Sequence, residues 1–158
     1  MIQLKTMLTC IDNSGAALVE CALVIGQKRH ARIGMLGQNE TSHNVWGLCC
    51  GFGSNWDDYT GDRIVVVVQE QRGASSSGMA GISAANKVKR GDIRHAVVVR
   101  TKYPTQRRDG SVVKFDDNAC VLLNKSGDPV GSRINGVVGA ELKRKKWSKI
   151  LSMAPMQA

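Results

Sequence analysis

Two groups of residues in this chain have the types needed for chemistry, namely five cysteines and three histidines. Cys49 and Cys50 are adjacent, and His43 stands a short way before them. A zinc site needs ligands spaced so that each can point at the metal, as in Cys-x-x-Cys pairs. Adjacent cysteines with one histidine do not offer that spacing. The pattern therefore favours thiols in a loop over a metal site.

Catalysis by a nucleophile needs a Cys or Ser beside a base and an orienting acid. His30 follows Arg29 and His95 follows Arg94, and neither histidine stands in a recognisable nucleophile motif. Glycine-rich loops of the Gly-x-x-x-x-Gly-Lys-Ser/Thr or Gly-x-Gly-x-x-Gly type are absent from the sequence. We expect no catalytic residue, metal or cofactor. An enzyme is the opposing hypothesis, which alkylation of Cys49 and Cys50 would test.

Most of the chain consists of short apolar runs rich in β-branched residues, separated by turn residues. These runs must form the elements that position any site. Their length favours strands over helices, and five or six such runs without helices between them favour a small closed barrel. The chain also starts with a strand-like run. We therefore expect a mainly β fold with a small closed barrel. The candidate strands are the runs Ile2–Lys5, Ala17–Ile25, Ile64–Val68, Ala96–Val99, Val112–Phe115 and Ala119–Leu123.

Glycines mark the expected turns. Asp109-Gly110 stands between a basic arm and the run that begins at Ser111, as in a hairpin whose tip needs positive φ. Gly61-Asp62 and Gly91-Asp92 each precede a strand as plausible entry turns. Two stretches have no clear period and read as loops. The barrel is thus expected over residues 1–139, with a loop insertion at about 34–60 and a flexible loop at 73–86.

Residues 140–158 form a basic C-terminal segment with a different pattern. From Ala140 to Met153, four apolar side chains can share one face of a helix, which Pro155 would end. Those four are Leu142, Trp147, Ile150 and Leu151. The solvent-facing side would carry Lys143, Arg144, Lys145, Lys146 and Lys149.

The whole chain has a formal net charge of +9, and the positive charge is concentrated in its second half. Residues 87–158 hold sixteen Lys and Arg against six Asp and Glu, whereas residues 1–86 hold six against seven. Clustered cations neutralise phosphates and release their counterions, which favours binding, so a nucleic acid is the expected partner. A membrane is not expected, because no apolar run approaches the roughly 20 residues of a span.

Aromatic residues are scarce in this basic half, with only Tyr103, Phe115 and Trp147. We therefore expect recognition of the shape and backbone of folded RNA rather than base stacking on an aromatic platform. A solvated charged surface is the alternative, and it explains isolated lysines better than so large an excess. The candidate RNA contacts lie before, at the end of and after the predicted strands: Lys89, Arg90, Arg100, Lys102, Arg107, Arg108, Lys114 and Arg133.

Several motifs in this order resemble the universal large-subunit ribosomal protein L-fourteen family. The match runs along most of the chain, and it is specific through the order and spacing of the motifs rather than through any one of them. The motifs are Asp12-Asn13-Ser14-Gly15-Ala16, Gly61-Asp62-Arg63-Ile64, Val88-Lys89-Arg90-Gly91-Asp92, Ala96 to Lys102, Asp109 to Asp116, Asn118 to Asn124, Gly131-Ser132-Arg133-Ile134, Lys149 to Ser152 and Ala154-Pro155.

The resemblance implies a five-stranded barrel with a small C-terminal helical part, bound to large-subunit rRNA at the subunit interface. It implies a bridge to small-subunit rRNA, neighbours of the L-three and L-nineteen types, and a subunit-association inhibitor that meets the basic residues 143–149. Ala17-Leu18 stands where bacterial relatives usually have paired arginines, and residues 34–60 lie mostly outside the family pattern. These departures resemble fungal mitochondrial members, which implies a place in the ribosome of the mitochondrial matrix. A free-standing RNA-binding regulatory barrel is the alternative function.

Overall fold

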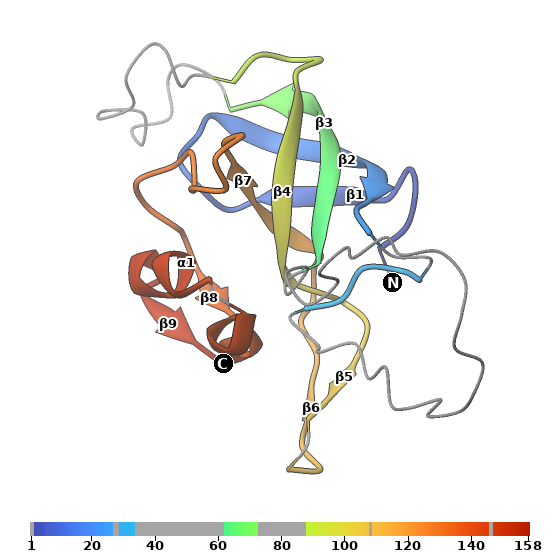
Figure 1. The fold of residues 1–158 in the computed structure, drawn as a ribbon, viewed down its shortest axis with the longest axis vertical. Coiled ribbons are helices and arrows are strands. Elements are labelled where there is room, and N and C mark those ends of the chain that lie inside the picture. The colour runs from blue at the N-terminus through green and yellow to red at the C-terminus, as the bar shows by residue number, and fades with distance from the viewer. Residues whose placement is uncertain (1, 27–28, 34–61, 73–87, 108, 146) are drawn as a thin grey trace, which may run out of the picture.

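A closed barrel of five strands forms the body of the protein. The structure is a computed structural model that describes residues 2–26, 29–33, 62–72, 88–107, 109–145 and 147–158. The barrel order is β1-β2-β3-β4-β7, as Figure 1 shows, and its pairings are antiparallel except for the parallel contact between β1 and β7. The mainly β, five-stranded prediction is confirmed. The strands are β1 (Met7–Cys10), β2 (Ala16–Val24), β3 (Arg63–Gln71), β4 (Ile93–Arg100) and β7 (Ala119–Leu123).

Alternation of side chains along the strands fills the barrel. In β3, Ile64, Val66 and Val68 are fully buried, while the valines between them are partly exposed on the outer face. Strand β7 is buried at all five positions. Cys120 and Leu122 lie in the interior cluster, whereas Ala119, Val121 and Leu123 belong to a second apolar cluster outside the barrel. The continuous apolar run of β7 therefore reflects a strand covered on both faces.

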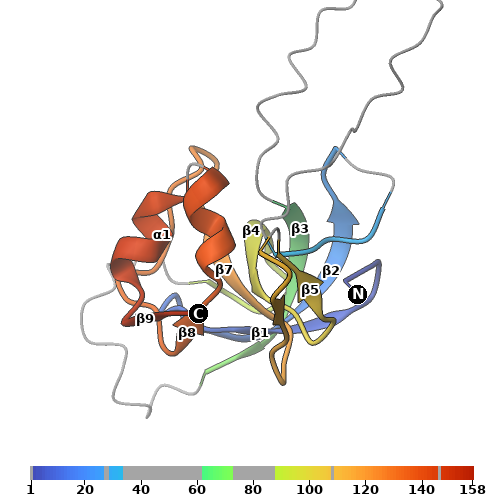
Figure 2. The same ribbon diagram turned by 90° about the horizontal axis from the view of Figure 1, so that it is seen from below.

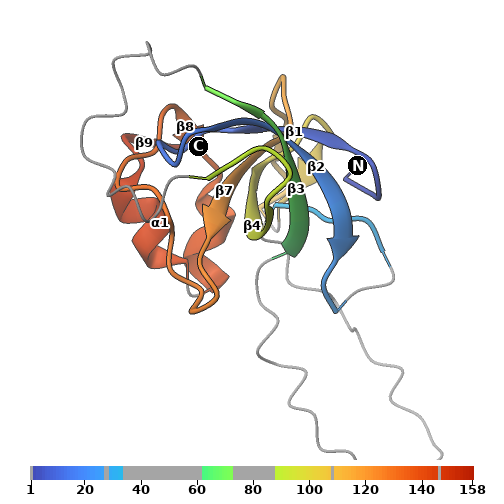
Figure 3. The same ribbon diagram turned by 90° about the horizontal axis from the view of Figure 1, so that it is seen from above.

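The C-terminal segment covers that outer face. It comprises a 3-10 helix (Ala140–Lys145), α1 (Ser148–Met153) and β9 (Met156–Gln157), and β8 (Val137–Val138) directly precedes it. Leu142, Ile150 and Leu151 join the second apolar cluster with residues of β4 and β7. Figures 2 and 3 show the segment beside β7, to one side of the barrel.

The expected helix over 140–153 is two short helices instead. Trp147 has φ −93° and ψ 32°, and this departure from helical geometry separates them. Leu142 and Ile150 are nonetheless both fully buried, one on each side of the break. Pro155 ends the second helix as expected, because the preceding Ala154 is already extended, with ψ 134°. The chain beyond it pairs in parallel as β9 with β8.

The predicted strand at Ile2–Lys5 is wrong. Only Ile2 forms a bridge, with Ala31. The chain then turns: the amide of Thr6 donates to the carbonyl of Gln3 at 3.1 Å, and Lys5 takes a φ of 65°. This turn prevents a continuous strand, so the pairing begins at Met7.

The expected hairpin is present and extends below the barrel in Figure 1. Its strands are β5 (Thr105–Gln106) and β6 (Val112–Val113), so the strand predicted to reach Phe115 pairs over two residues only. Gly110 at the tip has a φ of 79°. Gly91, at the predicted turn into β4, has a φ of 86°. The two predicted loops, 34–60 and 73–86, lie outside the described residues.

The buried carboxylate of Asp12 joins the two strands where the barrel closes. Its Oδ2 accepts the Leu122 amide of β7 at 2.9 Å, and its Oδ1 accepts the Ser14 amide at 3.1 Å and the Cys10 thiol at 3.0 Å. The Ser14 hydroxyl also donates to Oδ1. The parallel contact between β1 and β7 has only two register pairs, so these hydrogen bonds strengthen a short seam.

Replacement of Asp12 by alanine should therefore lower the free energy of unfolding by about 3 kcal/mol, because it leaves buried amides without an acceptor. Urea unfolding followed by circular dichroism would measure this loss. Asp128→Asn is the matched control, since that carboxylate is exposed at the surface. Equal stability of the Asp12→Ala variant and the wild type would show that the seam does not need the carboxylate.

Replacement of Ile150 by alanine should cost about 2–5 kcal/mol, because it opens a cavity beneath the C-terminal segment. Met156→Ala should change little, since Met156 is 64% exposed. The same urea titration compares the two variants. A small effect at Ile150 would mean that the segment adds little to the stability of the barrel.

Candidate RNA interface

The predicted RNA contacts fall at opposite ends of the barrel. Strand β4 is eight residues long, which corresponds to about 25 Å of extended chain. Lys89 and Arg90 precede it, whereas Arg100 and Lys102 stand at and after its end. We call these the entry end and the exit end of the barrel, after the start and the finish of β4. The candidates therefore form two separate surfaces and not one patch.

The entry end presents Lys89, Arg90 and Arg133, all exposed. The backbone beside the first two is fixed on β3: the Gln71 side chain donates to the Val88 carbonyl at 2.7 Å, and the Gly91 amide donates to the Val68 carbonyl at 2.8 Å. Part-buried contacts thus fix the turn, while its two cations stay in solvent.

Asn13 fixes the third cation of the entry end. Its Oδ1 accepts the amides of Ser132 at 2.8 Å and Arg133 at 3.2 Å. A Cβ at position 131 would lie 2.7 Å from that oxygen, which is too close, so only glycine fits there. The Asp12-to-Ala16 motif therefore has a structural role, in which Asp12 closes the barrel and Asn13 positions Arg133.

At the exit end, Lys102 and Lys114 are exposed, but Arg100 is held within the protein. Its Nη2 donates to Asp117 Oδ2 at 2.9 Å, and its side chain is 17% exposed. Gly136 lies against the same guanidinium, since a Cβ there would stand 3.1 Å from Nη1. Arg100 thus shapes the exit end, and its contact with RNA stays a prediction.

Arg107 connects the hairpin to the C-terminal segment. It forms an ion pair with Glu141 and donates to the Ala158 carbonyl at 2.7 Å. Its charge is therefore already partnered, and its role in RNA binding stays a prediction. Arg108 lies outside the described residues.

Among the cations predicted for the C-terminal segment, Lys143 and Lys149 are exposed. Lys149 pairs with Asp128, and this hydrogen bond lowers the pKa of the Asp128 carboxyl. Exposed pairs of this kind contribute little to stability, so the pair leaves Lys149 available to a partner. The side chains of Arg144 and Lys145, and the whole of Lys146, lie outside what the structure describes.

Sequence reasoning missed two further cations of the entry end, Arg94 and Lys125. Arg94 is the second residue of β4, and Lys125 follows the end of β7, which runs antiparallel to β4. The pairing of these strands brings the start of one beside the end of the other. The apolar runs 96–99 and 119–123 were recognised, so an antiparallel pairing of the two would have placed both cations.

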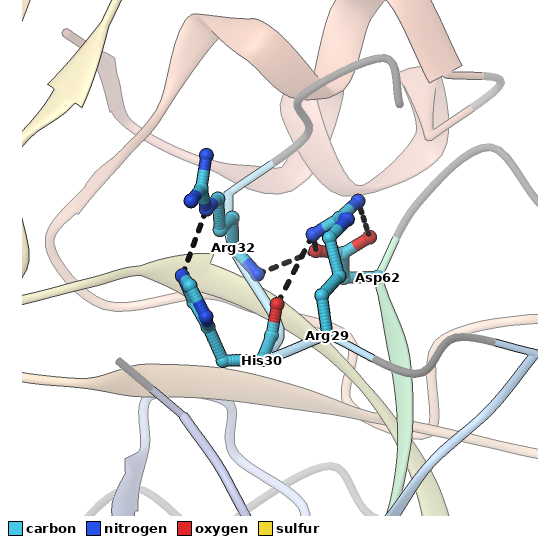
Figure 4. A network of polar contacts seen from close by, with 4 residues as sticks. All are labelled: Arg29, His30, Arg32 and Asp62. Carbon is cyan, nitrogen blue, oxygen red and sulfur yellow. Dashed lines mark hydrogen bonds and ion pairs between the residues drawn. The ribbon is translucent and has the colours of Figure 1, made fainter. Parts of the chain in front are cut away.

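A polar network fixes the chain on both sides of residues 34–61. The Asp62 carboxylate is fully buried and accepts Arg29 Nη1 at 3.1 Å and Nη2 at 3.3 Å, together with the Arg32 amide (Figure 4). Arg32 Nε donates to His30 Nε2 at 2.9 Å. The His30 ring also meets the edge of Tyr103, with centroids 6.1 Å apart. This network joins residues 29–32 to the start of β3 and to the exit end.

The described residues contain no group of three or more His, Cys, Asp or Glu side chains that could hold a metal ion. His43, Cys49 and Cys50 lie outside those residues. No helix in the described ranges is both long and apolar enough to cross a membrane.

A family model described as "Ribosomal protein L14p/L23e" matches residues 1–39 and 53–158. The chain belongs to this family. Among curated relatives, the large ribosomal subunit protein uL14m of Neurospora crassa is 70% identical over 158 residues, all of both chains. The protein of the same name from Schizosaccharomyces pombe is 45% identical over 155 residues, 98% of each chain. The predicted family, a fungal mitochondrial member, is confirmed.

We expect the protein to lose stability in mild acid, because His30 accepts a hydrogen bond from Arg32 through its neutral ring. Burial lowers the pKa of His30, and the nearby charges of Arg32 and Arg29 lower it further. As the pH falls below about 6.5, the unfolded chain takes up the proton before the folded protein does. Stability that is present above about pH 6.5 should therefore decrease as the pH falls through the lowered pKa.

Urea unfolding at about pH 7.5 and about pH 5.5 would measure this loss. His30→Gln should show a weaker pH dependence than the wild type, because glutamine keeps an acceptor for Arg32 and does not titrate. Identical pH profiles for the two proteins would contradict the role of His30 in the loss of stability.

Proposed function

We propose that the chain is a structural protein of the mitochondrial large ribosomal subunit and binds its rRNA through both ends of the barrel. The family is one of ribosomal proteins, which are structural components and not enzymes. The two relatives described above carry the name of a large-subunit protein, uL14m. The proposal extends that role to the surfaces of this chain.

One observation supports rRNA binding above others. Six exposed cations on turns or loops at the two barrel ends have no carboxylate partner among the described residues. Unpaired cations at fixed turns release counterions when they meet phosphates, and this favours binding to RNA of any sequence. The six are Lys89, Arg90, Lys102, Lys114, Lys125 and Arg133.

The finer assignments follow from where the remaining cations lie. Lys143 and Lys149 lie on the C-terminal segment, to one side of the barrel (Figures 2 and 3). We assign the basic residues of 143–149 to a bridge with small-subunit rRNA or to a subunit-association inhibitor. The ion pair of Arg107 fixes the hairpin against this segment, so both can meet neighbouring proteins of the L-three and L-nineteen types. Placement of Lys143 and Lys149 in solvent supports this division of roles.

A free-standing RNA-binding regulatory barrel is the second candidate. Such barrels stack bases on aromatic side chains of their strands. Among the described residues, Tyr103 is the one exposed aromatic side chain, at 44%, and it follows β4 rather than standing within a strand. This arrangement favours backbone recognition of folded rRNA.

The double variant Lys89→Gln with Arg90→Gln should reduce retention of the protein in large subunits on high-salt gradients. Each lost phosphate contact makes the salt dependence of binding shallower by about 0.9 in the log–log slope. Lys143→Gln with Lys149→Gln is the charge-matched control. It should leave retention unchanged and reduce the fraction of joined subunits.

Recovery of the wild-type protein only in soluble fractions would overturn the proposal. Equal losses of retention in both double variants would contradict the assignment of separate roles to the entry end and the C-terminal segment.

A further inference from the structure

A cleft of about 500 Å³ opens at the entry end, where β4 begins and β7 ends. His95 and Leu123 are register partners across these strands, so the pairing itself brings the two walls together. None of the residues that line it was predicted as an RNA contact. They are Asp92, Ile93, Arg94, His95, Leu123 and Lys125.

Two cations at this cleft are available to an anion. Arg94 is 33% exposed, and its ion pair with Asp92 is long, at 3.7 Å. The same Asp92 oxygen accepts the Lys89 amide at 3.1 Å, so the carboxylate is shared between two donors. Lys125 is exposed, and no partner for its ammonium group exists among the residues that the structure describes.

The cleft also has an apolar side. Ile93 is 69% exposed and projects from the same face of β4 as His95, two residues on. Arg94, between them, projects from the other face, so the cleft extends around the start of the strand. The His95 ring is partly buried and has no hydrogen-bond partner within the described part of the chain. An isoleucine and an imidazole side by side offer an apolar contact together with a group that can hydrogen bond.

We propose that this cleft binds one unpaired nucleotide of the rRNA, with its base against Ile93 and His95 and its phosphate on Arg94 and Lys125. The inference rests on the proposed function and adds a specific subsite to it. The volume lies within the range of small-ligand pockets. Proteins read RNA mainly at loops and bulges, where unstacked bases can enter such pockets.

An acidic protein segment is the competing occupant. It would use the two cations but would leave the exposed Ile93 without a partner. Lys89 and Arg90 continue the positive charge along the adjacent turn, as a groove that follows an RNA backbone would require. These features favour RNA.

Binding of a fluorescent oligouridylate to the full-length protein tests the proposal. Arg94→Gln with Lys125→Gln should weaken binding about tenfold and make the log–log salt slope shallower by about 1.4, for two contacts with a single strand. Lys5→Gln with Arg63→Gln removes the same charge from two side chains that are not assigned to RNA binding, and it should leave binding nearly unchanged. Equal weakening by both pairs, or tighter binding of polyglutamate than of the oligouridylate, would overturn the inference.

Asp92→Asn gives a second, opposite test. Asparagine keeps an acceptor for the Lys89 amide but no longer attracts Arg94. The variant should bind the oligouridylate a few-fold more tightly. Unchanged or weaker binding would show that Arg94 does not reach the phosphate.

Photo-crosslinking in intact large subunits identifies the occupant. Adducts between thiouridine in the rRNA and residues 92–95 or 123–125 would support the inference, whereas crosslinks from these residues to another protein would overturn it. In that second case the protein still sediments with the subunit, so the proposed function stands. Failure of the wild-type protein to sediment with subunits would instead refute the proposed function.

Discussion

The buried carboxylate of Asp12 is the interaction on which the rest of this structure depends. Strands β1 and β7 meet over two register pairs, and the carboxylate accepts hydrogen bonds from Cys10 on β1 and Leu122 on β7. Strand β7 also carries the outer apolar cluster that holds the C-terminal segment. Asn13, the next residue, fixes the backbone at Arg133. Two adjacent residues of one short turn thus support the closing seam of the barrel and place one surface cation.

The sequence predicted the barrel well where burial and pattern agree. The runs around Val66, Val98 and Val121 are strands because their β-branched side chains pack on one or both faces of the sheet. The chain start was misjudged, since Ile2 and Leu4 imitate an alternating strand, yet Lys5 takes a turn conformation and Leu4 is 67% exposed. The parallel pairing of β8 with β9 also has no local signal, because two residues on each side are too few to form a pattern.

The candidate interface was predicted in part. The exposed state of Lys89, Arg90, Lys102 and Lys114 follows from their positions at turns and strand ends. The sequence could not show that Arg100 and Arg107 are engaged within the protein, because Asp117 and Glu141 reach them only through the tertiary fold. Nor could it separate the candidates into two ends, since that division depends on the direction of β4. Charge counts identify the class of partner, whereas the pairing of strands decides which cations can act together.

The bond between Arg29 and Asp62 has a consequence for how the chain tolerates added length. It holds together the two points between which residues 34–61 depart and return. The entropy needed to close a loop grows only with the logarithm of its length, so each doubling costs about 0.6 kcal/mol more. Doubling the number of residues between the two points would therefore lower the stability of the barrel only slightly. The family model passes over residues 40–52 within this span. A change of chain length in this span would therefore cost the barrel little stability.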